Sequence, residues 1–114
     1  MTMSKGEIWL VNLDPTIGDE IRKTRPVVIV NNDAAGILAL RVIVPLTAWQ
    51  AKFQGCHWMI RLDPDSSNGL EKPSAADAFQ VRSVSSQRFT RKLGQLAESD
   101  LNRVADGLRA VLDL

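Results

Sequence analysis

The chain has 114 residues, and its 14 lysines and arginines stand against 13 aspartates and glutamates, which gives a formal net charge of +1. With 45% apolar and 24% charged residues, we expect a folded core within one domain, residues 1–114, rather than disorder. One cysteine and one histidine exclude an intramolecular disulfide and a zinc site of the usual Cys/His type. The N-terminus lacks the apolar core of a signal peptide, and no run of about 20 apolar residues predicts a membrane span. We therefore expect a small soluble protein without metal or membrane, and its lone cysteine suits a reducing cytoplasm.

The near-neutral total conceals an uneven distribution of charge along the chain. Residues 34–62 hold three basic residues and no acid, and residues 78–97 hold four basic residues and no acid. Such blocks form a positive face where a fold brings them together. On charge alone, the better interpretation is that the basic and acidic blocks simply alternate around a solvated surface.

Two strands on either side of a polar loop are predicted in the N-terminal part. Residues 6–13 combine β-branched and aromatic residues in a short run that ends at Pro15, which predicts a strand followed by a turn. Residues 16–24 are polar and contain a glycine, as is typical of a loop. Pro26 then opens the apolar run 27–30, which predicts a strand buried on both faces, since proline is tolerated at the first residue of a strand.

Three further strands are predicted before a helix. They cover residues 38–44, ended by Pro45, residues 57–62 and residues 78–84. Between them, residues 63–74 contain Asp-Pro, Asn-Gly and Lys-Pro pairs, which predict a loop or hairpin connection. The apolar residues between 101 and 112 recur at helical spacing, with Ser99 as a plausible N-cap. Gly107 lowers the helix propensity there, so we expect a packing reason for it.

This order of elements predicts the fold class. Five or more short strands followed by one amphipathic helix favour a mainly β protein. We expect a small barrel-like sheet with the C-terminal helix packed on it.

Standard catalytic signatures do not occur in the sequence: there is no phosphate-binding loop, nucleophile elbow or zinc-protease helix. Cys56 and His57 are adjacent, and neighbours on a strand point to opposite faces, so they make a poor nucleophile pair. We expect Cys56 to be buried or half-buried and His57 to lie at the surface of a strand. The polar segment 19–26 remains, and in it Arg25 abuts a core strand and offers a fixed fork of donors to a phosphate. Thr47 lies just after another core strand and is a second candidate. The alternative, which is commoner for polar segments of this kind, is an ordinary solvated loop.

Several motifs, taken in chain order, resemble those of one known family. They are residues 6–11, residues 13–20 with Asp14-Pro15-Thr16, residues 24–30 with Thr24-Arg25-Pro26, residues 44–47 with Pro45-Leu46-Thr47, and residues 80–83 with Gln80-Val81-Arg82. Over essentially the whole chain, this series resembles the MazF/PemK family of toxin ribonucleases. The resemblance implies a homodimer of SH3-like β-barrel subunits (CcdB/MazF-like) that cleaves single-stranded RNA, usually mRNA, at short sequences without metal or cofactor. It also implies a bacterial cytoplasmic toxin whose cognate antitoxin blocks the RNA-binding groove with its C-terminal segment.

The resemblance also implies the catalytic residues. RNA supplies its own nucleophile, the 2′-OH, so neither a covalent enzyme residue nor a metal is required. Arg25 matches the catalytic arginine of the family and would stabilise the phosphorane. Thr47 matches the catalytic serine or threonine and would hydrogen-bond the scissile phosphate. Glu20 matches a family acid in the same loop, where it would orient Arg25 or accept a proton; an ordinary loop carboxylate is the alternative.

The identity of the general base stays open at this point. Some family members carry an acid directly before the glutamine of the Gln-x-Arg segment, where this chain has Phe79. Asp77 would share a face with Phe79 on the predicted strand, so it is a second candidate beside Glu20. An equally good interpretation is that Asp77 only begins the predicted strand and has no catalytic role.

Binding of single-stranded RNA requires cations along the backbone and flat groups that stack on bases. The candidates are Thr16, Arg22, Lys23, Trp49, Gln80 and Arg82. Trp49 and Phe53 suit either base stacking or the core. Trp9 and Trp58 belong to predicted strands, and we expect them in the core or at a dimer contact.

Two alternatives from other functional classes remain. A related toxin group on this fold binds and poisons DNA gyrase, which would make the chain a protein-binding module. Because Phe79 replaces a possible base, a non-catalytic RNA-binding barrel is the second alternative.

Overall fold

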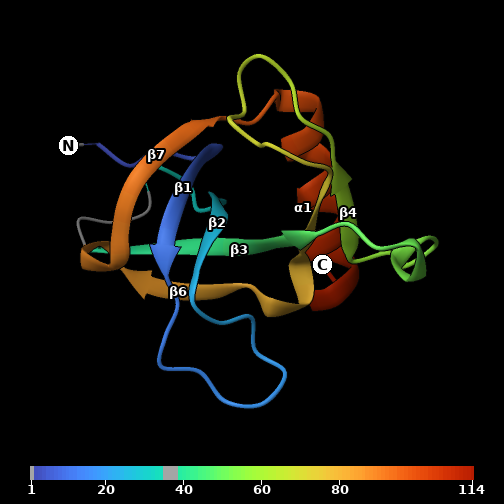
Figure 1. Ribbon diagram of the computed structural model, residues 1–114, viewed down its shortest axis with the longest axis horizontal. Coiled ribbons are helices and arrows are strands. Elements are labelled where there is room, and N and C mark those ends of the chain that lie inside the picture. The colour runs from blue at the N-terminus through green and yellow to red at the C-terminus, as the bar shows by residue number, and fades with distance from the viewer. Residues whose placement is uncertain (1, 35–38) are drawn as a thin grey trace.

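The computed structural model describes residues 2–34 and 39–114, and in them an antiparallel sheet is joined to one C-terminal helix (Figure 1). The strands are β1 (Glu7–Asn12), β2 (Thr24–Ile29), β3 (Leu40–Ala48), β4 (Met59–Leu62), β5 (Ser74–Asp77), β6 (Arg82–Ser85) and β7 (Phe89–Gln95). The helices are α1 (Glu98–Leu112) and the short 3-10 helices η1 (Ala51–Phe53), η2 (Ala78–Gln80) and η3 (Ser86–Arg88). Leu38, where a strand is predicted to begin, lies outside the described residues.

The sheet has the strand order β4-β5-β3-β2-β1-β7, and β6 also pairs with β3. Ile43 of β3 pairs with Ile29 of β2 and with Arg82 of β6, so β2 and β6 lie on opposite edges of β3. Figure 1 shows β1 and β7 running across the direction of β3 and β6, so the sheet is strongly bent. Among the described residues no pairing joins β4 to β7, and the expected barrel therefore stays open. The predicted mainly β fold with a C-terminal helix is confirmed.

Apolar side chains on the two faces of the sheet form two separate cores. Alternation along β2 sends Val28 into a core that also holds Val104 of α1, and sends Val27 and Ile29 into a second core with Trp9. The apolar run of this strand is thus buried on both faces, as its pattern predicts. Each such side chain stabilises the fold by roughly 1.5–3 kcal/mol relative to exposure.

The prediction that Pro45 ends its strand is wrong, because β3 continues to Ala48. Along a strand the backbone N–H and C=O groups of successive residues point alternately to the two edges. Those of Val42 bond toward the β2 side, so the nitrogen of Pro45, three residues later, points to the other edge of β3. On that edge the pairing with β6 ends at Ile43 and the pairing with β5 begins at Leu46. The missing N–H of the proline therefore removes no ladder hydrogen bond.

The strand predicted over residues 78–84 is wrong in its first half. Residues 78–80 form η2, and Asp77 caps it by accepting a hydrogen bond from the backbone N–H of Phe79 at 3.1 Å. Asp77 and Phe79 therefore do not share the face of a strand. The structure also adds two strands that the sequence does not predict, β5 and β7, and β5 takes up the last residue of the predicted 63–74 loop.

Two of the remaining predictions around residues 56–60 need correction. The strand predicted from His57 begins at Met59, so His57 is exposed in a turn rather than on a strand. Cys56 is half-buried, as expected. Trp9 lies in the core, whereas Trp58 is 40% exposed because it belongs to the turn before β4; of its two predicted places the core is excluded, and the dimer contact stays a prediction.

Helix α1 begins two residues earlier than its predicted cap implies. Its N-cap is Ala97, not Ser99, which lies within the first turn together with two acids that favour a helix start. A Cβ added at Gly107 would lie 3.3 Å from both Ala78 and Ile60. The expected packing reason for this glycine is therefore confirmed: it lets α1 approach η2 and β4 closely.

A buried carboxylate at the start of β1 yields a prediction on stability. Glu7 is 8% exposed, and its Oε1 accepts hydrogen bonds from the Trp9 indole and the Ser4 backbone, while its Oε2 pairs with Lys92 at 3.0 Å. Burial raises the pKa of Glu7, but these three partners together hold that pKa below its usual 4.5.

A carboxyl whose pKa is lowered by folding contributes stability above its unfolded-state pKa and loses it as pH falls through the folded pKa. We expect Glu7→Gln to lower the free energy of unfolding by about 2 kcal/mol near neutral pH, because the charged partner of Lys92 is removed. The deficit should shrink in acid, where Glu7 itself is protonated. Urea unfolding at both pH values measures it, and an equal loss in acid would contradict the assignment.

Candidate functional site

A pocket of about 470 Å³ lies between the β1–β2 loop and the segment from η2 into β6. Its lining residues are Leu13, Asp19, Glu20, Ile21, Pro45, Phe79, Gln80, Val81 and Arg82. Three of the predicted site residues, Glu20, Gln80 and Arg82, are thereby brought together from two segments about sixty residues apart. The pocket combines a carboxylate, an amide and a guanidinium beside the exposed ring of Phe79.

Gln80 ties the β1–β2 loop to η2 through both ends of its amide. Its Oε1 accepts the backbone N–H of Ile21 at 2.6 Å, and its Nε2 donates to the Asp19 carbonyl at 3.1 Å and to Asp77 Oδ2 at 3.2 Å. The amide therefore fixes the wall of the pocket from the inside.

We expect Gln80→Ala to loosen this loop without unfolding the protein. The substitution leaves the half-buried Ile21 N–H without its acceptor, a loss of about 1–3 kcal/mol in local stability. Hydrogen exchange should accelerate at Ile21 and remain unchanged at Val28 in the core of β2. Equal exchange at Ile21 in both proteins would show that the amide does not hold the loop.

Two arginines hold the beginning of the same loop. Arg82 Nη1 donates to the Leu13 carbonyl at 3.4 Å, and Arg88 Nη1 donates to the carbonyls of Asn12 and Asp14. Nothing local in the sequence indicates that Arg88 has a partner more than seventy residues earlier. The positive charge of residues 78–97 thus partly faces the site.

The loop is also braced internally around Asp14. Asp14 Oδ1 accepts hydrogen bonds from the Thr16 hydroxyl at 3.2 Å and from the Lys23 backbone N–H at 3.1 Å. Lys23 adopts a left-handed conformation with φ 69°, which is uncommon for a residue other than glycine. Thr16 and Lys23 are therefore fixed at the base of the loop, while the side chains of Arg22 and Lys23 are exposed.

The two candidate general bases have different environments. Glu20 is exposed, lines the pocket, and accepts the Ile17 N–H with Oε1 at 2.6 Å, while its Oε2 accepts no hydrogen bond from the described residues. Asp77 is buried, and its two oxygens accept from Phe79 and Gln80. Burial raises the pKa of Asp77, against the effect of those hydrogen bonds. Asp77 does not belong to the pocket lining described above.

Arg25 and Thr47 occupy corresponding positions on β2 and β3. Val27 pairs with Pro45 at the end of the β2–β3 ladder, and Arg25 and Thr47 each lie two residues beyond this last pair. Residues two apart on a strand share a face, so Arg25 and Thr47 lie on the face of Val27 and Pro45; Pro45 lines the pocket, whereas Arg25 and Thr47 are not among its lining residues. The Arg25 Nε donates to the Arg22 carbonyl at 3.2 Å, so the loop orients the guanidinium.

Trp49 lies beyond the pocket lining, at the end of β3. The Trp49 ring meets the Phe53 ring edge-on, with 5.8 Å between the two ring centres. The guanidinium of Arg61 lies 5.3 Å from the centre of the Trp49 ring. Trp49 is half-buried, and its backbone N–H bonds to the Pro73 carbonyl. The sequence names Trp49 and Phe53 but gives no signal for Arg61, because this contact joins residues on different strands.

Comparison with known proteins places the chain in a family. Residues 4–112 match the family model described as PemK-like, MazF-like toxin of type II toxin–antitoxin system. The chain belongs to this family of toxins. It is 34% identical to endoribonuclease MazF9 of Mycobacterium tuberculosis over 118 residues, with 98% of both chains covered. It is 33% identical to endoribonuclease PemK of Escherichia coli over 112 residues, covering 96% of this chain and 82% of the relative.

Solved structures share the fold at lower identity. A mycobacterial endoribonuclease in complex with its cognate antitoxin superposes with a TM-score of 0.77 at 19% identity, over 99% of this chain and 97% of that chain. In the described part of this toxin, no helix is both long and apolar enough to span a membrane. The same residues contain no cluster of His, Cys, Asp and Glu side chains that would hold a metal ion.

Proposed function

We propose that residues 1–114 act as one toxin domain that cleaves single-stranded RNA at specific sequences, using the 2′-OH of the substrate as nucleophile. As a member of this toxin family with curated relatives that are endoribonucleases, the chain is an RNA-cleaving toxin. The observation that carries the finer proposal is the pocket that brings Glu20, Gln80 and Arg82 together next to Pro45, with Arg25 and Thr47 each two residues from the last β2–β3 pair, Val27 with Pro45.

Each catalytic group has a distinct task in this reaction. A base removes the proton of the 2′-OH, whose oxygen attacks the adjacent phosphorus and forms a phosphorane with two negative charges. Arg25 stabilises that charge with its guanidinium, and Thr47 hydrogen-bonds a phosphate oxygen. The bond to the 5′-oxygen then breaks, and this oxygen takes up a proton. The products are a 2′,3′-cyclic phosphate and a 5′-hydroxyl.

Glu20 is the better candidate for the base. Its carboxylate lines the pocket and keeps one oxygen without a hydrogen bond from the described residues, whereas both oxygens of buried Asp77 are engaged. A base must reach the proton that it abstracts, and exposure in the pocket supports Glu20 on that ground. Asp77 then acts as the cap of η2.

The RNA-binding residues of the proposal surround this centre. The RNA strand is contacted from one side of the pocket by the loop residues Thr16, Arg22 and Lys23. It is contacted from the other side by Gln80 and Arg82. Trp49 extends the contact beyond Thr47. Because family members of this type are paired with an antitoxin, as in the mycobacterial complex, we further propose a cytoplasmic homodimer neutralised by a cognate antitoxin.

Mapping of cleavage ends on a long RNA tests the function. With EDTA present, we expect cuts at a short recurring sequence, with 5′-hydroxyl and cyclic phosphate ends. An RNA with a single 2′-deoxynucleotide 5′ to the cut should resist cleavage at that site. Cleavage that needs an added metal, or that survives the 2′-deoxy substitution, contradicts the mechanism. Inhibition of gyrase without any RNA cleavage would favour the protein-binding alternative, and RNA bound but left intact would favour the non-catalytic one.

A further inference from the structure

One row of side chains crosses the sheet from Thr47 of β3 to Arg61 of β4. Thr47 of β3 pairs with Ala75 of β5, and Ala75 pairs with Arg61 of β4. Residues directly opposite one another in an antiparallel sheet point to the same face, so the Arg61 side chain lies on the Thr47 face. The neighbouring Ile60 faces the other way, toward Gly107 of α1.

The two ends of this row lie close together. Strands lie about 4.8 Å apart, so the backbones of Thr47 and Arg61 are separated by about 10 Å, and Ala75 between them is completely buried. A short stretch of extended RNA spans that distance. A strand held with its scissile phosphate at Thr47 therefore passes within reach of the Arg61 guanidinium.

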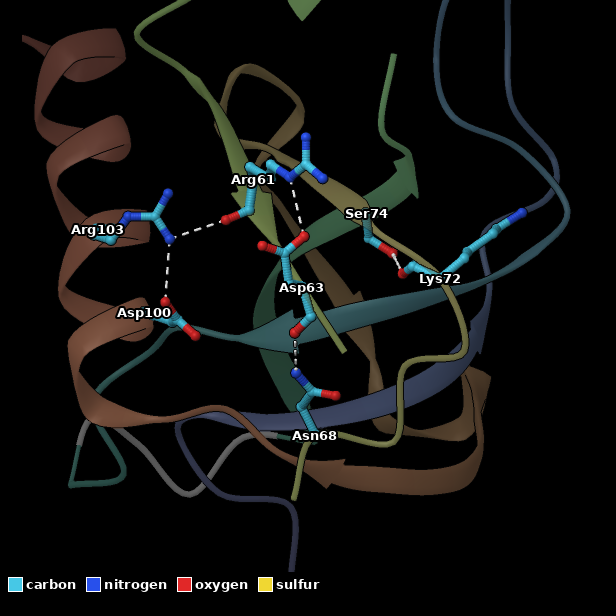
Figure 2. A network of polar contacts seen from close by, with 7 residues as sticks. All are labelled: Arg61, Asp63, Asn68, Lys72, Ser74, Asp100 and Arg103. Carbon is cyan, nitrogen blue, oxygen red and sulfur yellow. Dashed lines mark hydrogen bonds and ion pairs between the residues drawn. The ribbon is translucent and has the colours of Figure 1, made fainter. Parts of the chain in front are cut away.

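The protein holds Arg61 in place without using up its donors. Arg103 of α1 donates to the Arg61 carbonyl at 2.9 Å, and Figure 2 shows the Arg61 side chain extending away from the helix that carries Arg103 and Asp100. The guanidinium lies 5.3 Å from the centre of the Trp49 ring, and its Nε bonds to Asp63 at 3.0 Å. Its two terminal nitrogens have no acceptor among the described residues.

The ion pair of Arg61 with Asp63 is a weak competitor for a phosphate. The two side chains are 45% and 64% exposed, and exposed pairs of this kind contribute little to stability. A phosphate, by contrast, takes two parallel hydrogen bonds from a guanidinium fork. A second cation, Lys52, has its Nζ 5.7 Å from the centre of the Phe53 ring, which contacts Trp49.

We propose that Arg61, oriented by Trp49, binds a backbone phosphate of the RNA beside the scissile one and thereby sets the position of the strand over Thr47. This inference rests on the proposed function, since it assigns a subsite to the same substrate. The residue acts in binding, and it takes no part in proton transfer.

Binding of a non-cleavable RNA tests the subsite separately from catalysis. The probe is a labelled oligonucleotide of the mapped cleavage sequence with a 2′-deoxynucleotide 5′ to the cut, and its Kd is measured by fluorescence anisotropy over a range of salt concentrations. We expect Arg61→Gln to weaken binding about tenfold and to lower the salt slope by about 0.7, the value for one contact to a single-strand phosphate. In cleavage assays the same variant should raise KM and leave kcat unchanged.

Arg109→Gln is the matched control. Arg109 also pairs with a neighbouring acid, Asp106, at 2.8 Å, but it lies on α1, which packs on the opposite face of the sheet. The control removes the same unit charge and should leave the salt slope and KM as they are. Circular dichroism verifies that both variants are folded.

A second variant gives a change of opposite sign. Asp63→Asn removes the carboxylate that competes for the Arg61 guanidinium and keeps the backbone carbonyl that Asn68 binds, so RNA affinity should rise. A purely structural ion pair would make both substitutions neutral for binding. Equal binding curves for Arg61→Gln and Arg109→Gln overturn the inference while the unchanged protein still cleaves RNA. If the unchanged protein neither binds nor cuts RNA, the proposed function itself fails.

Discussion

Arg25→Ala is expected to lower the single-turnover rate of RNA cleavage by about 10²–10³-fold, the usual effect of removing one donor that stabilises transition-state charge. Arg25 shares a strand face with Val27, the partner of Pro45, and the Arg22 carbonyl orients its Nε. Its charge matters most when the phosphorane forms, so the loss should appear chiefly in kcat. The chemical step is measured by quenched-flow cleavage of a short labelled RNA at saturating enzyme.

The control for this prediction is Arg109→Ala, which removes an arginine from the exposed side of α1 and should cleave RNA at the normal rate. Arg25→Lys keeps the charge but loses the guanidinium fork, and we expect it to fall between Arg25→Ala and the unchanged protein. The unfolding midpoint of Arg25→Ala should stay near that of the unchanged protein, since Arg25 is only half-buried. Undiminished cleavage by folded Arg25→Ala would remove Arg25 from the site.

The elements that the sequence predicts well are those with a strong local pattern. The apolar run of β2 and the helical spacing of α1 each identify an element without knowledge of its partners. Arg25 and Thr47 are named from the family resemblance and from their places beside buried strands, and their roles stay a prediction. Their distance from the Val27–Pro45 pair depends on the register of β2 and β3, which the local pattern does not specify.

The elements that escape prediction depend on distant partners. The Ser-Ala-Ala-Asp segment of β5 has no β-branched or aromatic residue, yet it becomes a strand because it lies between β3 and β4 and its small side chains are completely enclosed there. Pro45 passes through β3 only because its nitrogen faces a gap between β5 and β6.

The same limit applies to the candidate site. Gln80 is identified by its motif, but its hydrogen bond to Ile21 joins residues 59 positions apart. The contact between Arg61 and Trp49 and the anchoring of the loop by Arg88 also join distant segments. The sequence thus indicates which residue types take part, and the sheet register decides which of them meet.

The other large effect concerns two glycines at which the 63–73 connection meets β7. A Cβ at Gly69 would lie 2.2 Å from the Leu93 carbonyl oxygen, and a Cβ at Gly94 would lie 2.3 Å from the Ser67 carbonyl oxygen. The Gln95 N–H donates to that same Ser67 carbonyl at 2.9 Å. Backbone meets backbone here, so no flexible side chain is available to move aside.

We expect Gly69→Ala to lower the free energy of unfolding by about 4 kcal/mol. Part of this loss comes from the left-handed backbone, φ +70°, and part from overpacking against β7. Gly18→Ala separates the two causes, since Gly18 has φ +59° but nothing within 4 Å of its Cβ, and it should lose only about 1 kcal/mol. Urea unfolding at one fixed protein concentration compares them, because assembly would shift both midpoints. Equal losses would mean that the connection does not approach β7 this closely in solution.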